Sequence, residues 1–194
     1  PGLCALEDLA RQGLPSDGDI LVFSCFDHEE VGSESRTGAA GPILEDVLRR
    51  TAFALGRDED GYARMIASST CVSADAAHSI HPKYPEVHDP SHHPVMGRGP
   101  ILKINAKQRY ATNGVGMALW KRACDAAGVP TQNFVSNNAS PCGTTIGPIT
   151  ATRLGIETVD VGVGLLSMHS AREMSHVADL LGLRKVLAAY WLGA

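Results

Sequence analysis

Along the chain, hydrophobic residues follow one of two patterns: short continuous runs, or single positions repeated every three or four residues. Two short runs, 19–26 and 68–74, are almost free of charge, as in strands that are buried in a sheet. Other segments repeat apolar residues every three or four positions, which is typical of amphipathic helices. The pattern predicts strands at 19–26, 68–74, 101–104, 132–136 and 158–163 and helices at 3–12, 38–55, 113–127, 144–154 and 171–191.

Glycine and proline mark the boundaries of these elements. We expect the first helix to end near Gly13 and Pro15, the second at Gly56 and the third at Gly128. The segment 82–100 contains five prolines and predicts a long surface loop. Because strands alternate with helices, the predicted fold class is an α/β three-layer sandwich, in which helices cover both faces of a mostly parallel central sheet.

The composition fits one domain of 194 residues, with 44% hydrophobic and 20% charged residues. A net charge of -4 gives no basic surface for nucleic acid, and no apolar stretch approaches the ~18 residues that span a bilayer. We therefore expect neither nucleic acid nor a membrane as a partner. The five cysteines lack CxxC spacing, which indicates reduced thiols and a cytoplasmic location. The chain starts at Pro1 rather than methionine, which suggests a fragment or a processed product.

Two adjacent glutamates, Glu29 and Glu30, directly follow the apolar run 19–26. The end of a strand is where open α/β sheets place their ligands. Neighbouring carboxylates at such a turn can point in different directions, so one can bind a metal while the other handles a proton. The alternative is a solvated acidic turn, because glutamate is mostly exposed in proteins.

Other predicted strands also end in residues of metal-ligand type. Asp75 follows the second strand and His169 follows the last one. Since the carboxyl ends of parallel strands meet at one edge of a sheet, we expect both to approach Glu29 and Glu30. Carboxylates and imidazole bind zinc, manganese or cobalt, and a base beside the metal takes a proton from bound water. A single aspartate at a strand end is more often a turn residue.

Six motifs stand in order along the chain: DHEEVGS at 27–33, SADAAHSIHP at 73–82, GPILKIN at 99–105, KQRY at 107–110, PCGTTIGP at 141–148 and MHSARE at 168–173. Together they resemble the catalytic domain of the aspartyl aminopeptidase family. These are binuclear zinc exopeptidases that remove N-terminal aspartate or glutamate from peptides. The resemblance spans nearly the whole chain and implies a zinc exopeptidase-like fold.

The resemblance also implies roles for individual residues. Two divalent ions are expected, zinc in the first place with manganese or cobalt as alternatives, together with peptide substrates that have an acidic N-terminus and a homo-oligomeric assembly. The implied roles are general base for Glu29, zinc ligand for Glu30, Asp75 and His169, recognition of the acidic substrate side chain for Lys103, and substrate-pocket positions for Tyr110, Cys142, Gly143, Thr144 and Thr145.

Physical reasoning supports this division of roles. A pocket that buries a substrate carboxylate needs a positive group, and Lys103 stands alone in an apolar strand. The alternative is an edge-strand lysine that discourages aggregation. Gly143 and Thr144 at a helix start offer free N–H groups for a carboxylate or an oxyanion, or simply cap the helix. His78 follows Asp75 closely and is expected to orient a ligand or stabilise a tetrahedral intermediate, whereas we expect His88 at the surface or in a subunit contact.

The chain departs from the family pattern in one respect. The family uses two further ligands, a histidine from an N-terminal segment and a bridging aspartate, and a separate dimerisation domain, all of which lie upstream of these residues. We therefore expect 1–194 to be the C-terminal part of the catalytic domain, and the isolated chain to be inactive. Competing interpretations are a zinc aminopeptidase of other specificity and a non-catalytic shell or scaffold relative. A nucleotide-binding module fits poorly, since no glycine-rich loop follows the first strand.

Overall fold

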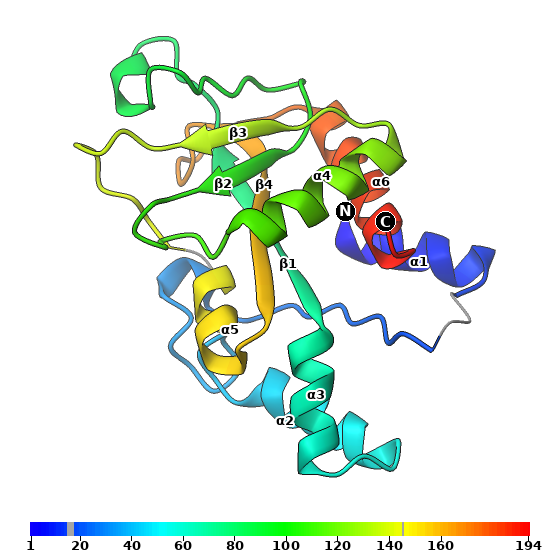
Figure 1. Cartoon of the computed structure of the whole chain (residues 1–194). Helices are drawn as coiled ribbons and strands as arrows, with labels where there is room; N and C mark the ends of the chain where they lie inside the picture. Colours follow the sequence, from blue (N-terminus) through cyan, green and yellow to red (C-terminus); the bar gives the residue numbers. More distant parts are fainter. Residues whose placement is uncertain (15–17, 145) are drawn as a thin grey trace.

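The computed structural model describes residues 1–14, 18–144 and 146–194, so Pro15 and Thr145 lie outside the described residues. Figure 1 shows a central sheet with helices on both sides. The strands are β1 (Thr70–His78), β2 (Ile101–Ile104), β3 (Gln132–Val135), β4 (Glu157–Leu166) and β5 (Met174–Ser175). The helices are α1 (Gly2–Gln12), α2 (Ile43–Ala54), α3 (Glu59–Ser68), α4 (Gly114–Ala127), α5 (Ile146–Leu154) and α6 (Val177–Trp191), with short 3-10 turns η1 (Glu29–Val31) and η2 (Pro85–Val87).

The strand order in the sheet is β1-β4-β2-β3, and β5 pairs with β4. The longest pairing, between β1 and β4, is parallel, as is that of β2 with β3, whereas β4 meets β2 and β5 in antiparallel fashion. The sheet is therefore mixed. The predicted α/β class with helices on both faces is confirmed.

The two faces of the sheet differ in chemistry because side chains alternate along β4. Val159, Val161 and Val163 belong to the main hydrophobic core, together with Trp120 of α4 and Val186 of α6. The intervening positions of β4 are Asp160 and glycines, and Asp160 lies against Gly147 of α5 and the backbone of Ala111, next to Tyr110. One face thus provides stability, and the other is free to carry polar side chains.

Most predicted elements are present, with shifted boundaries. The helix expected at 113–127 is α4, where the Asn113 side chain accepts bonds from two backbone N–H groups and Gly128 ends the helix with a φ of 62°. The helix expected at 38–55 begins only at Ile43, after Pro42. The sequence patterns missed α3, which the Asp58 side chain caps through the N–H of Gly61.

Three expectations about strands and helices are wrong. Residues 19–26 form no strand, because among the described residues β1 pairs with β4 alone. Asp75 does not follow its strand but lies inside β1, which continues to His78. The last helix starts at Val177 rather than at 171, since 174–175 pair with β4 and the His176 side chain caps the helix.

The loop 82–100 is largely irregular, as predicted, and contains a short 3-10 turn and an isolated bridge between His88 and Ser136. No helix among the described residues is long and apolar enough to cross a membrane.

Candidate active site

A tight turn presents the two glutamates. The backbone has positive φ at His28 (62°), Gly32 (105°) and Ser33 (62°), which bends the chain sharply on both sides of η1. The N–H of Ser33 donates to the carbonyl of His28 over 2.8 Å and closes the turn. The Glu30 side chain is largely exposed, whereas Glu29 is half-buried. The two neighbouring carboxylates therefore occupy different environments, as expected.

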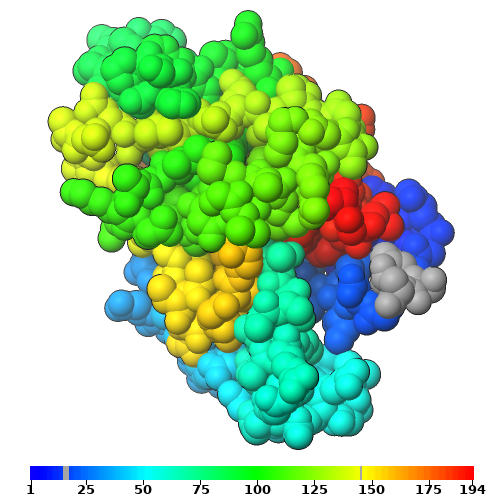
Figure 2. All heavy atoms as spheres, in the orientation of Figure 1, coloured from blue at the N-terminus to red at the C-terminus, as the bar shows by residue number. Residues whose placement is uncertain are grey.

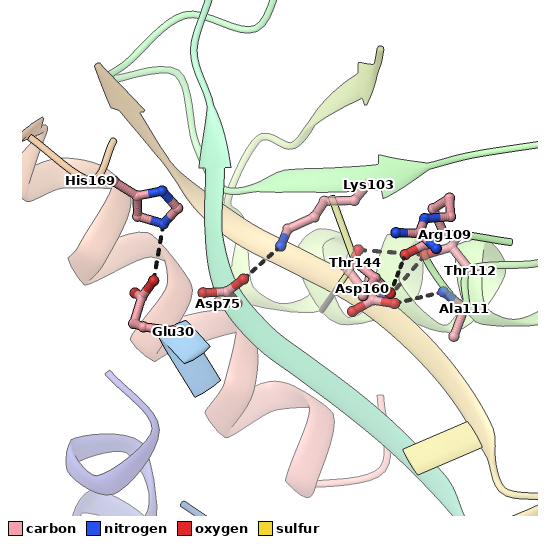
Figure 3. A network of polar contacts seen from close by, with 9 residues as sticks. All are labelled: Glu30, Asp75, Lys103, Arg109, Ala111, Thr112, Thr144, Asp160 and His169. Atoms are coloured by element: carbon pink, nitrogen blue, oxygen red, sulfur yellow. Dashed lines mark hydrogen bonds and ion pairs between the residues drawn. The ribbon is translucent and has the colours of Figure 1, made fainter. Parts of the chain in front are cut away.

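Glu30 meets His169, which comes from the loop after β4. The imidazole Nε2 of His169 lies 3.0 Å from Oε2 of Glu30 (Figure 3). His169 has a φ of 65°, and its backbone N–H donates to the carboxylate of Glu173. Glu173 thus holds the loop that carries the histidine, a contact that the sequence pattern did not predict.

Asp75 meets Lys103 across the face of the sheet. The ammonium Nζ of Lys103 lies 3.1 Å from Oδ2 of Asp75, and the lysine side chain is only 2% exposed. Gly162 of β4 lies in register between Asp75 of β1 and Ile101 of β2, and a Cβ atom there would lie 2.8 Å from the carbonyl oxygen of Asp75. The ammonium also lies 5.3 Å from the ring centroid of Tyr110. A buried ammonium without such partners would carry a large desolvation cost.

The carboxyl group of Glu29 interacts electrostatically with the members of both pairs. Burial raises the pKa of its carboxyl, and the charges of Asp75 and Glu30 raise it further, while Lys103 and His169 act in the opposite direction. These interactions require all five side chains to lie near one another. The structure therefore brings together the predicted base, the three predicted metal ligands and the predicted specificity lysine.

The predicted substrate-pocket residues lie against one another beside Lys103. The Thr144 hydroxyl donates to the carbonyl of Arg109 over 3.1 Å, and Nε of Arg109 donates to the carbonyl of Cys142 over 3.3 Å. Tyr110 is buried, which raises the pKa of its phenol, and its ring packs against Phe134. Gly143 is exposed, with open space around it. The loop around Gly143 and the segment 109–110 thus form one wall.

His78 lies at the end of β1 and packs on Phe134, with ring centroids 6.1 Å apart. The desolvation from this packing lowers the pKa of His78, and the nearby His88, Lys103 and His169 lower it further. His78 therefore lies close to the site. The expectation of a surface position for His88 is wrong, because its ring is buried edge-on against Phe134.

One supporting residue was missed by sequence reasoning. Asp160 in β4 is fully buried, and its Oδ2 accepts the N–H of Ala111 over 2.6 Å (Figure 3). Its backbone N–H donates to the Thr112 hydroxyl over 3.0 Å. These bonds hold the segment just after Tyr110 against β4. The signal in the sequence was a single carboxylate in an otherwise apolar strand.

The carboxylate of Asp160 leaves no room for a side chain at position 147 in α5, where the chain has a glycine. A Cβ atom added there would lie 2.2 Å from Oδ1 of Asp160. We expect Gly147→Ala to lower the free energy of unfolding of the full-length protein by about 1–3 kcal/mol, as overpacking does. Denaturant unfolding measures this, with Gly114→Ala as the control because its Cβ would meet open space. Equal stability of the two variants would refute the packing of Asp160.

The three predicted ligands have the right atom types for zinc, but they are not arranged around one ion position. Glu30, Asp75 and His169 offer the oxygen and nitrogen ligands that zinc prefers. Glu30 and His169 are in contact, whereas Asp75 is engaged by Lys103. Within the described residues no group of three His, Cys, Asp or Glu side chains is placed to hold an ion.

An α/β sheet with carboxylates, an imidazole and a half-buried glutamate at one edge is typical of a metal-dependent hydrolase. Residues 2–191 match the family described as aminopeptidase I zinc metalloproteases (M18). The chain belongs to this M18 family, which confirms the resemblance inferred from the six motifs.

Similar proteins of known name support the assignment. The chain is 52% identical over 191 residues to the protein named "Probable M18 family aminopeptidase 2" of Streptomyces coelicolor, covering 97% of this chain and 44% of the relative. The structure of Ape4 in complex with Nbr1 matches with a TM-score of 0.86 at 38% identity, covering 98% of this chain and 37% of that one. The mApe1 dodecamer of S. cerevisiae matches with a TM-score of 0.81 at 30% identity, covering 98% and 42%. The chain therefore spans about two fifths of the length of these relatives.

Proposed function

We propose that the full-length protein is a zinc-dependent aminopeptidase that removes N-terminal acidic residues from peptides. The observation that carries this proposal is the half-buried carboxylate of Glu29, whose pKa is raised by burial and by the neighbouring Asp75 and Glu30. A general base of this kind is needed next to a metal-activated water.

In this proposal Glu30, Asp75 and His169 are metal ligands, and the rest of the full-length protein supplies the ligands that complete the site. Zinc, when bound, supplies an acidified water and polarises the peptide carbonyl. Manganese or cobalt would serve the same chemistry with these donors. Residues 1–194 are then the C-terminal part of a catalytic domain, and on their own they bind metal weakly and are inactive.

Glu29 handles the proton. Its carboxylate takes the proton of the attacking water and returns it to the leaving amine. The raised pKa matches this role, because a base with a pKa nearer neutrality also gives the proton up more readily as an acid. In this proposal His78, whose pKa is lowered by desolvation, donates a hydrogen bond to the oxygen of the tetrahedral intermediate.

Lys103 provides the preference for acidic residues. Its ammonium has three N–H donors, and Asp75 accepts one of them, which leaves donors for a substrate carboxylate. In this proposal Tyr110, whose ring lies beside the ammonium, and Gly143 and Thr144 contact the substrate side chain.

The dodecameric relative supports a homo-oligomer for the full-length protein. The composition supports a cytoplasmic location, with neither nucleic acid nor membrane as a partner.

Metal removal tests the proposed function. We expect full-length protein dialysed against a chelator to lose hydrolysis of a chromogenic aspartyl substrate and to regain it when zinc is added. The matched leucyl substrate reports the preference and should be turned over more slowly by the same preparation. Hydrolysis that survives complete metal removal would exclude this function.

A further inference from the structure

The turn that carries the two glutamates belongs to a loop, residues 27–41, that is hydrogen-bonded to itself. The N–H of Asp27 donates to the carbonyl of Thr37 over 3.1 Å, and the N–H of Ala40 donates to the carbonyl of Ser33 over 3.2 Å. Ser33, in the middle of the loop, is only 2% exposed. Because these bonds hold the loop together, its place relative to the sheet depends on the contacts that it makes with other segments.

Arg153, in the last turn of α5, reaches this loop although it lies 113 positions further along the chain than Ala40. Its Nη1 donates to the carbonyl of Ala40, and its Nη2 lies 3.6 Å from Oε2 of Glu45. In Figure 2 the yellow residues of α5 lie against blue residues of the loop. Ala40 donates its N–H to Ser33, which donates its own N–H to the carbonyl of His28 over 2.8 Å. A short series of hydrogen bonds therefore leads from the guanidinium to the residue before the proposed base.

Helix α5 is fixed at both ends. Near its start Gly147 lies against the buried carboxylate of Asp160, and at its end Leu154 packs against the hydrophobic cluster between α2 and α3. An arginine in the last turn of a helix commonly interacts with the helix dipole alone. The guanidinium of Arg153 instead donates to an acceptor on another segment, and a hydrogen bond from a charged donor is stronger than one between neutral groups. Helix α5 therefore offers a fixed attachment point for the loop.

We infer that Arg153 is a positioning residue, which fixes the turn of the two glutamates relative to the sheet. Among the described residues, two side-chain contacts of hydrogen-bond or ion-pair type join the loop to other segments. One is the bond from Arg153 to the carbonyl of Ala40. The other joins Glu30 to His169, and both of these side chains are largely exposed and are proposed metal ligands. Arg153 thus supplies the contact that does not involve a proposed ligand.

This positioning role deepens the proposed function and rests on it. A general base acts only where its carboxylate reaches the attacking water, and misplacing a reacting group by about 1 Å can cost about 10²-fold in rate. Helix α5 also follows closely on the loop of Gly143 and Thr144. One helix therefore connects the proposed substrate wall at its start to the proposed base at its end.

Steady-state kinetics on two variants of the full-length protein, both loaded with zinc, test the inference. Arg153→Met keeps much of the side-chain stem without the donors, and we expect kcat to fall by about 10–100-fold at unchanged KM. Arg49→Met is the matched control, because Arg49 is 35% exposed against 33% for Arg153 and contacts the same Glu45, but its bonds stay within α2 and α3. It should keep its kcat. A normal kcat in Arg153→Met, or equal losses in the two variants, would overturn the inference.

Amide hydrogen exchange of the loop gives a second readout, which needs no activity. We expect the N–H groups of Ser33 and Ala40 to exchange about tenfold faster in Arg153→Met, as for the loss of one hydrogen bond to a charged group, and at the unmodified rate in Arg49→Met. Unchanged exchange in Arg153→Met would overturn the inference. If that variant does not fold, Arg153→Gln takes its place in the same comparison. If the unmodified protein does not hydrolyse the aspartyl substrate, the proposed function fails, while exchange still decides whether Arg153 holds the loop.

Discussion

Replacing Glu29 by glutamine in the full-length protein is expected to reduce kcat by about 10²–10⁴-fold, the usual contribution of a general base. Glutamine keeps the shape of the side chain and cannot accept the proton. Because Glu29 is assigned no metal contact, the zinc content and KM are expected to stay unchanged. Steady-state kinetics with a chromogenic aspartyl substrate, alongside elemental analysis, measures all three quantities.

Glu34→Gln is the control for this substitution, because Glu34 is an exposed glutamate in the same loop. It should leave kcat unchanged. A Glu29→Gln enzyme with normal kcat would show that another group moves the proton. Loss of zinc from it would instead make Glu29 a ligand.

Replacing Lys103 by methionine is expected to remove the preference for acidic substrates. Methionine fills the buried volume without the charge, so the substrate carboxylate loses a partner worth about 2–5 kcal/mol. The ratio of kcat/KM for aspartyl over leucyl substrates should fall by at least about 30-fold, since 1.4 kcal/mol is tenfold. The same kinetic assay on both substrates gives this ratio.

Lys103 also stabilises the fold, because its removal leaves the carboxylate of Asp75 without its partner. A change of structure alone would slow both substrates equally and leave the ratio intact. That result would refute the specificity role. Lys107→Met, at an exposed lysine in the same segment, should change neither rate nor ratio.

The fold was predictable where local patterns decide the structure. Asn113 and Gly128 identified the ends of α4 because capping is a local interaction. The run 19–26 has the composition of a strand, but a strand exists only when a partner accepts its hydrogen bonds. Residues 174–175 pair with β4, so the last helix is shorter than predicted, and no local sequence pattern predicts such a contact.

The site was predictable at the level of residue types and of the edge where they meet. Glu30 and His169 are far apart in sequence and in contact in the structure, as expected. The ion pair of Lys103 with Asp75 depends on the register through Gly162, which the sequence does not reveal. The supporting bonds of Asp160 and Glu173 depend on tertiary contacts in the same way.

In the proposed mechanism the two adjacent glutamates have separate roles, Glu29 as the base and Glu30 as a metal ligand. Zinc per subunit, measured by elemental analysis on full-length Glu29→Gln and Glu30→Gln, tests it most directly. We expect Glu29→Gln to keep the zinc content of the unmodified protein and Glu30→Gln to lose part of it. Equal zinc contents in the two variants, or loss only in Glu29→Gln, would contradict it.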